Sequence, residues 1–119
     1  MSNKVIITEV GLRDGLQNQP KLIATAQKLT MAKALIDAGV SHLEATSFVH
    51  PKLVPQMADA VDVLSGLKEL TQSSDNTHLN VSVLVPNMKG YERARENGVT
   101  SIGVVVASTD TFNLKNLNM

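Results

Sequence analysis

The densest group of chemically active side chains lies near the start of the chain, in the stretch EVGLRDGLQN at positions 9–18. Arg13 offers a planar fork of donors that suits a carboxylate or a developing oxyanion. Asp14 offers hard oxygen ligands for a divalent cation such as Mg²⁺ or Mn²⁺. Glu44, farther along the chain, can orient Arg13 or take part in proton transfer. Together, these three groups can polarise a carbonyl group and stabilise an enolate.

The same stretch also has a simpler interpretation. Gly11 and Gly15 allow sharp backbone turns, and Arg13 and Asp14 are then a solvated ion pair in a polar surface loop. The spacing of the residues alone leaves both interpretations open. Which one applies depends on the elements that position these side chains.

These elements alternate between short β-branched runs and longer helical runs. Strands are predicted at 5–10, 42–45, 80–85 and 101–107, and helices at 25–38, 57–70 and 89–97. The first run, VIITEV, is nearly continuous in apolar residues, as in a strand buried on both faces. Asn87, just before the third helix, has a side chain suited to a helix N-cap. This order predicts an α/β fold with a parallel β/α repeat and right-handed crossovers.

Polar residues gather where the predicted strands end. Glu9 and Glu44 lie at the ends of the first two strands, and Asn87 follows the third. In (β/α)₈ barrels and open α/β sheets, this carboxyl edge holds the active site. A complete barrel needs about 250 residues, whereas this chain has 119. The pattern thus leaves open a small α/β domain or a part of a larger protein.

The composition argues against several classes of protein. The 11 Lys and Arg residues balance the 11 Asp and Glu residues, which leaves no electrostatic footprint for nucleic acid or an acidic membrane surface. No apolar run approaches the roughly 18 residues needed to cross a bilayer. The absence of cysteine excludes disulfides and thiolate chemistry within the chain. We expect a cytoplasmic protein, although an imported protein without its leader would have a similar composition.

Four sequence motifs, in the same order, resemble those of the hydroxymethylglutaryl-CoA lyases, which are DRE-TIM metallolyases with a (β/α)₈ barrel. The motifs are EVGLRDGLQN at 9–18, LEATSFVHPKLVPQM at 43–57, LVPNMKG at 84–90 and KNLN at 115–118. Related Claisen-type synthases open instead with TLRDGEQ, so Leu16 and Asn18 favour the lyases. The resemblance implies that residues 1–119 form the first four β/α units of an incomplete TIM barrel, the N-terminal part of a pyruvate-carboxyltransferase-like lyase domain.

The resemblance also implies roles for individual residues. Asp14 matches the aspartate that binds the divalent cation, Mg²⁺ or Mn²⁺. Arg13 matches the arginine that contacts the substrate carbonyl and stabilises the enolate of the leaving acetyl-CoA. Glu44 matches an active-site glutamate. Gln17 and Asn116 are expected to bind substrate, with Asn116 near the CoA arm.

The implied reaction is metal-dependent cleavage of the CoA thioester 3-hydroxy-3-methylglutaryl-CoA to acetoacetate and acetyl-CoA, by an enzyme that is a homodimer at full length. Ser47, inside the second motif, is expected at or beside the site. The family's His-x-His pair, its asparagine ligand and its catalytic cysteine come from the second half of the barrel. They have no match here, so we expect the isolated chain to be inactive. A related acyl-CoA synthase or aldolase, or a small non-catalytic α/β binding domain, stays an alternative.

Overall fold

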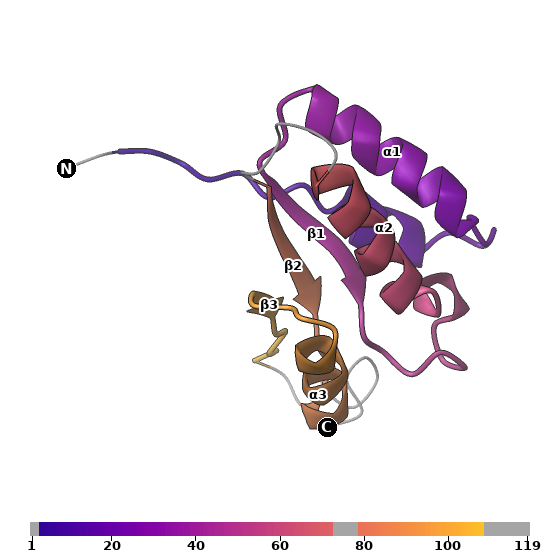
Figure 1. Ribbon diagram of the computed structural model, residues 1–119. Coiled ribbons are helices and arrows are strands. Elements are labelled where there is room, and N and C mark those ends of the chain that lie inside the picture. The colour runs from indigo at the N-terminus through magenta and orange to yellow at the C-terminus, as the bar shows by residue number, and fades with distance from the viewer. Residues whose placement is uncertain (1–2, 73–78, 109–119) are drawn as a thin grey trace.

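The structure, a computed structural model, describes residues 3–72 and 79–108 as a succession of helices and parallel strands (Figure 1). Its short helical segments are a π-helix, η1, and a 3₁₀-helix, η2. In chain order the elements are η1 (Gly11–Gly15), α1 (Thr25–Asp37), β1 (His42–Ser47), η2 (Pro55–Met57), α2 (Ala60–Gln72), β2 (Asn80–Leu84), α3 (Met88–Glu96) and β3 (Ile102–Gly103). The predicted alternation of strands and helices is therefore confirmed. No helix within these residues is long and apolar enough to cross a membrane.

The three strands form one parallel sheet in the order β1-β2-β3. All three long helices pack on the same face of that sheet. One buried cluster joins α1 and α2 to β1 and η1, and a second joins α2 and α3 to β2. The first consists of Leu12, Ala32, Leu43, Ala45, Val63 and Leu67, and the second of Phe48, Ala60, Val83, Val85 and Ala94. The opposite face of the sheet carries no helix from the described residues.

The helix ends follow the sequence signals. The side chain of Asn87 accepts a hydrogen bond of 2.9 Å from the Gly90 amide, so the predicted N-cap of α3 is confirmed. Gly39 and Gly98 follow α1 and α3 with φ of 103° and 78°. This left-handed conformation ends a helix at little cost when the residue is glycine.

The prediction of a buried first strand at 5–10 is wrong for this structure. Val5 and Ile7 are about four-fifths exposed, and only Glu9 makes a bridge, to Leu43 of β1. The run pairs with a neighbouring strand at that single point, so the described residues leave most of its apolar surface uncovered. Figure 1 shows this segment leaving the body of the protein toward the left.

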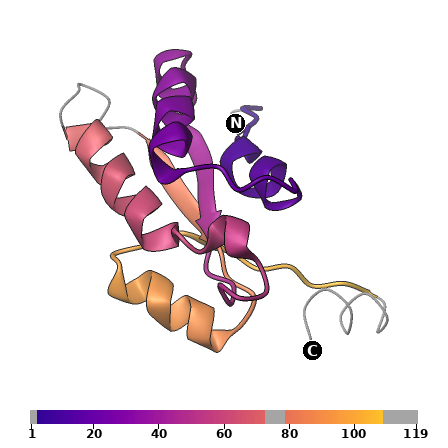
Figure 2. The ribbon, with the colours of Figure 1, turned by 90° about the vertical axis from the view of Figure 1, so that its right-hand side faces the viewer.

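The fourth predicted strand, 101–107, is also much shorter in the structure. Only Ile102 and Gly103 pair with β2, while Val104 and Val106 are exposed. Figure 2 shows the chain after β3 running away from the helices. A strand at the edge of a sheet has pairing groups on its free side, and no described segment lies there to extend it.

Two helical predictions also need correction. The polar loop expected after Gly11 is the π-helix η1, and the helix expected from residue 57 begins as η2 and continues as α2 from Ala60. The inward face of α2 includes Val63, whereas Val61 is exposed.

Candidate active site

The structure brings together four of the predicted site residues at the carboxyl edge of the sheet. The Nε atom of Arg13 donates a hydrogen bond to Oε1 of Glu44. Its Nη1 atom lies 3.3 Å from Oδ1 of Asp14 and 3.5 Å from Oε1 of Gln17. The side chains of Arg13 and Glu44 are each 16% exposed, whereas that of Asp14 is 55% exposed. Arg13 is thus the centre of a partly buried polar cluster with Asp14 on its outer side.

The π-helix η1 determines where Arg13 and Asp14 lie. The carbonyl oxygen of Val10 accepts hydrogen bonds from the amides of Arg13, Asp14 and Gly15, at 3.1, 2.8 and 3.3 Å. Leu12 is fully buried in the core and anchors this turn. π-Helical turns occur frequently at functional sites. Here the turn places the buried Leu12 directly before the partly buried Arg13 and the exposed Asp14.

Gly11 permits a close approach at the start of this turn. Its amide donates a 2.9 Å hydrogen bond to Oε1 of Glu9. A Cβ atom on Gly11 would lie 2.8 Å from that oxygen and 3.1 Å from Cε of Met31. A larger residue would therefore push Glu9 or Met31 aside, so the glycine serves close packing as well as turning.

A bulge in β1 places Glu44 and Ser47 on the same face of the sheet. Glu44 pairs with Ser82 and Ser47 pairs with Leu84, with an irregularity between Glu44 and Thr46. Residues two apart on a strand share a face, so Ser82 and Leu84 place their partners on one side. An added Cβ at Gly103 would lie 3.7 Å from the Leu84 side chain and 4.0 Å from Oε2 of Glu44, in agreement with this register.

Ser47 is buried and has no hydrogen-bond partner among the described residues. Its side chain is fully buried, and its Oγ atom contacts no donor or acceptor within the part of the chain that the structure describes. The neighbouring Thr46 behaves differently, because its hydroxyl lies 3.7 Å from Sδ of Met57 on the helix-covered side. The sequence placed Ser47 near the site, but the strand pattern gave no sign of the bulge that turns it toward the face of Glu44.

A buried ion pair braces the loops around this cluster, and the sequence analysis missed it. Nζ of Lys28 donates to Oδ1 of Asp59 at 2.7 Å and to the carbonyl of Gln56 at 2.6 Å, and the Lys28 side chain is 2% exposed. Thr25 donates to the other oxygen of Asp59 at 2.6 Å. Gln56 in turn donates to the carbonyl of Gln19 at 2.8 Å. The loop after η1 is thereby tied to the loop after β1.

The position of Lys28 was the available signal for this brace. It lies one turn before Ala32 on the inward stripe of α1, where a charged residue is rarely buried without a partner. The partner, Asp59, is 31 residues away in the sequence. Pattern reading along one helix does not reveal such a contact.

Among the described residues, one accessible carboxylate near the cluster is suited to a cation. Asp14 has an accessible carboxylate, which is a suitable hard ligand for Mg²⁺ or Mn²⁺. Glu44 is already engaged by Arg13. In the two described ranges, no group of three or more His, Cys, Asp and Glu side chains could hold a metal ion. Asn116, predicted to bind substrate, lies outside the described residues.

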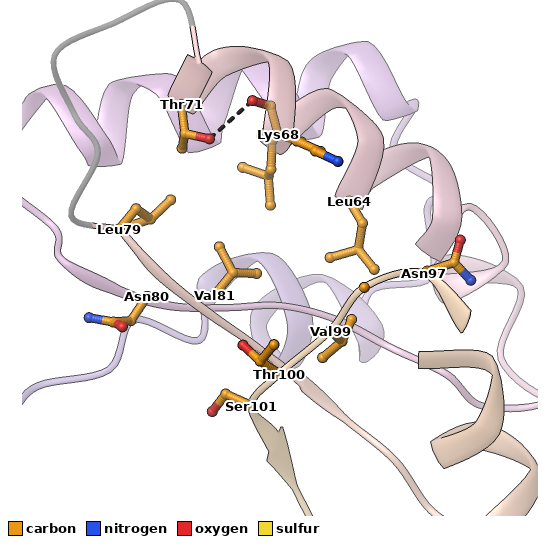
Figure 3. Close-up of a pocket in the computed structure, with 12 residues that line it drawn as sticks. Leu64, Lys68, Thr71, Leu79, Asn80, Val81, Asn97, Val99, Thr100 and Ser101 are labelled. Atoms are coloured by element: carbon orange, nitrogen blue, oxygen red, sulfur yellow. Dashed lines mark hydrogen bonds between the residues drawn. The ribbon is translucent and has the colours of Figure 1, made fainter. Parts of the chain in front are cut away.

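A hollow at the other end of the sheet is separate from this site. It has a volume of about 300 Å³ and lies beside Asn80, the first residue of β2. Figure 3 shows Leu64, Leu79, Val81 and Val99 around it. The polar cluster lies instead toward the carboxyl ends of the strands. The hollow is thus a gap between α2 and the start of β2, away from Arg13.

Comparisons with known proteins agree with the motif pattern. A family model described as HMGL-like matches residues 4–119. The hydroxymethylglutaryl-CoA lyase YngG of Bacillus subtilis is 44% identical over 115 residues, which cover 97% of this chain and 36% of the relative. The mitochondrial lyase of Rattus norvegicus is 42% identical over 118 residues, covering 99% and 34%. The chain spans about a third of the length of these relatives.

Solved structures show the same correspondence. The HMG-CoA lyase of Brucella melitensis matches with a TM-score of 0.85 and 40% identity, over 99% of this chain and 40% of that one. An HMG-CoA lyase from Acinetobacter baumannii, in complex with coenzyme A and 3-methylmalate, matches with a TM-score of 0.85 and 33% identity, over 96% and 35%. The described β/α units correspond to part of the barrel of these proteins.

Proposed function

The chain belongs to the HMGL-like family, with the fold of a partial (β/α)₈ barrel, and on this premise we propose that it supplies part of the active site of a hydroxymethylglutaryl-CoA lyase. The proposed reaction of the whole protein is cleavage of 3-hydroxy-3-methylglutaryl-CoA to acetoacetate and acetyl-CoA. The observation that carries the proposal is the cluster of Arg13, Glu44, Asp14 and Gln17 at the carboxyl edge of the sheet. That edge holds the active site in barrels of this type.

Arg13 is proposed to stabilise the charge that develops on the substrate. When the carbon–carbon bond breaks, its electron pair passes to the acetyl-CoA unit and forms an enolate, while a base removes the proton of the tertiary hydroxyl. A guanidinium placed at the thioester oxygen offsets that negative charge. Glu44 accepts the Nε hydrogen of Arg13, and this contact holds the guanidinium plane in a fixed direction.

Asp14 is proposed to hold a divalent cation, Mg²⁺ or Mn²⁺, together with ligands from outside the described residues. Its carboxylate is 55% exposed and adjoins Arg13, so it can reach a cation beside the substrate. A bound cation would polarise the substrate oxygens. Gln17 lies next to Arg13 and is proposed to contact substrate, as is Asn116.

The rest of the barrel is proposed to cover the edges that this chain exposes. Val5 and Ile7 before β1, and Val104 and Val106 after β3, are apolar and accessible. Strands added at these two edges would bury them and close the inner face. The complete enzyme is further proposed to be a homodimer, which light scattering on the full-length protein would test.

The test uses a hybrid enzyme in which residues 4–119 replace the matching third of the Bacillus subtilis lyase. We expect the hybrid to release acetoacetate and acetyl-CoA in the presence of Mg²⁺. Asp14→Ala should lower kcat/KM on the order of 10³-fold, because several kcal/mol of cation assistance are lost, and should weaken Mn²⁺ binding measured by titration.

Asp62→Ala, at an exposed position in the first turn of α2, is the control and should leave both quantities unchanged. A folded hybrid without turnover would refute the proposed function. A fully active Asp14→Ala variant would refute the role of Asp14 alone.

A further inference from the structure

The hydroxyl of Ser47 stands out among the buried polar side chains. Lys28 and Thr46, which are also buried, each have a partner, whereas Ser47 Oγ has none within the described residues. Buried hydroxyls in folded proteins nearly always have a hydrogen-bond partner, and one left without a partner lowers stability. A hydroxyl in this state is a candidate for binding a group from outside the described residues.

The bulge in β1 gives this hydroxyl its direction. A strand without the irregularity would place Glu44 and Ser47, three residues apart, on opposite faces. The observed register instead puts both on the face opposite the helices. Bulges often re-aim a side chain beside an active site. The bulge interrupts the regular strand and thereby places the Ser47 hydroxyl on the same face as Glu44 and Arg13.

We propose that Ser47 Oγ makes a hydrogen bond to an oxygen atom of the hydroxyacyl-CoA substrate, next to the Arg13–Glu44 pair; this inference rests on the proposed function. A serine hydroxyl both donates and accepts, so it suits the hydroxyl, carboxylate and thioester oxygens of such a substrate. Because the hydroxyl has no hydrogen-bond partner among the described residues, a bond to substrate would replace none of their hydrogen bonds.

The test compares Ser47→Ala and Thr46→Val in the hybrid enzyme. Both changes remove one buried hydroxyl from neighbouring positions of β1, but only Ser47 faces the side of Glu44. We expect Ser47→Ala to lower kcat/KM by about 10- to 100-fold, as for the loss of one substrate hydrogen bond. Thr46→Val should change kcat/KM by less than about threefold.

The melting temperature without ligand separates this role from a structural one. Because Ser47 Oγ has no hydrogen-bond partner among the described residues, Ser47→Ala should keep or raise the melting temperature of the ligand-free hybrid. A clear drop in melting temperature would mean that Ser47 bonds to the remaining part of the barrel, and would overturn the proposal. Unchanged kcat/KM in Ser47→Ala, or an equal loss in Thr46→Val, would overturn it as well. An unmodified hybrid that is folded but inactive would instead count against the proposed function.

Discussion

The two faces of the sheet differ in how far the described residues cover them. On the helix-covered face, Leu43, Ala45 and Val83 are almost fully buried, and helices from three parts of the chain contribute to the clusters. On the opposite face lie the Arg13–Glu44 pair and the hydroxyl of Ser47. The outer layer of this part of the barrel is therefore packed, while its inner layer is polar and incomplete. The apolar packing that stabilises the fold is therefore on the first face, and the proposed chemistry is on the second.

Glu44→Gln should lower activity rather than stability, because Glu44 lies on the open face of the sheet. The change keeps the shape of the side chain but removes the charge that holds the Arg13 guanidinium. We expect kcat of the hybrid enzyme to fall by about 10- to 100-fold, since a hydrogen bond to a charged group contributes about 1.5–3 kcal/mol.

Steady-state assays of the same preparation, with melting temperature alongside, would check this. Glu69→Gln, on the exposed side of α2, should match the unmodified hybrid. If Glu44→Gln retained full kcat, turnover would not depend on the contact by which Glu44 orients Arg13.

Lys28→Met should affect the packed region instead. The change leaves Asp59 without its buried cation, and breaking a buried pair costs roughly 3 kcal/mol or more. In the hybrid enzyme, which is about three times as long as this chain, such a loss lowers the melting temperature by about 3 to 6 °C. Thermal denaturation followed by circular dichroism would measure it.

Lys33→Met is the matched comparison, because Lys33 pairs with Asp37 on the same helix at the same distance of 2.7 Å, but at the surface. Its loss should cost less than about 0.5 kcal/mol. Equal melting temperatures for the two variants would show that burial does not decide the strength of these pairs.

The sequence predicted the order of elements better than their extent. The helices at Thr25–Asp37 and Met88–Glu96 are within a residue of expectation, because apolar spacing, Asn87 and the two glycines mark them locally. The runs at 5–10 and 101–107 have strand composition, but a strand also needs neighbours to pair with. The described residues offer those neighbours only at Glu9, Ile102 and Gly103.

The candidate site was predictable in its residues but not in its geometry. Motif resemblance selected Arg13, Asp14, Gln17 and Glu44, and the structure places them in one cluster. The π-helical turn, the bulge after Glu44 and the contact of Lys28 with Asp59 were not predictable. Each depends on residues far apart in the chain or on backbone irregularity, which periodicity does not encode.

The most direct test of the central claim is the turnover of the hybrid enzyme carrying Arg13→Met. Arg13 contacts Glu44, Asp14 and Gln17, and loss of a charge-stabilising donor lowers kcat by about 10²- to 10³-fold. Arg95→Met, in the last turn of α3, is the control. We expect Arg13→Met to lose activity on this scale with an unchanged circular dichroism spectrum. Activity equal to that of the Arg95→Met control would contradict the claim that this cluster carries out the chemistry.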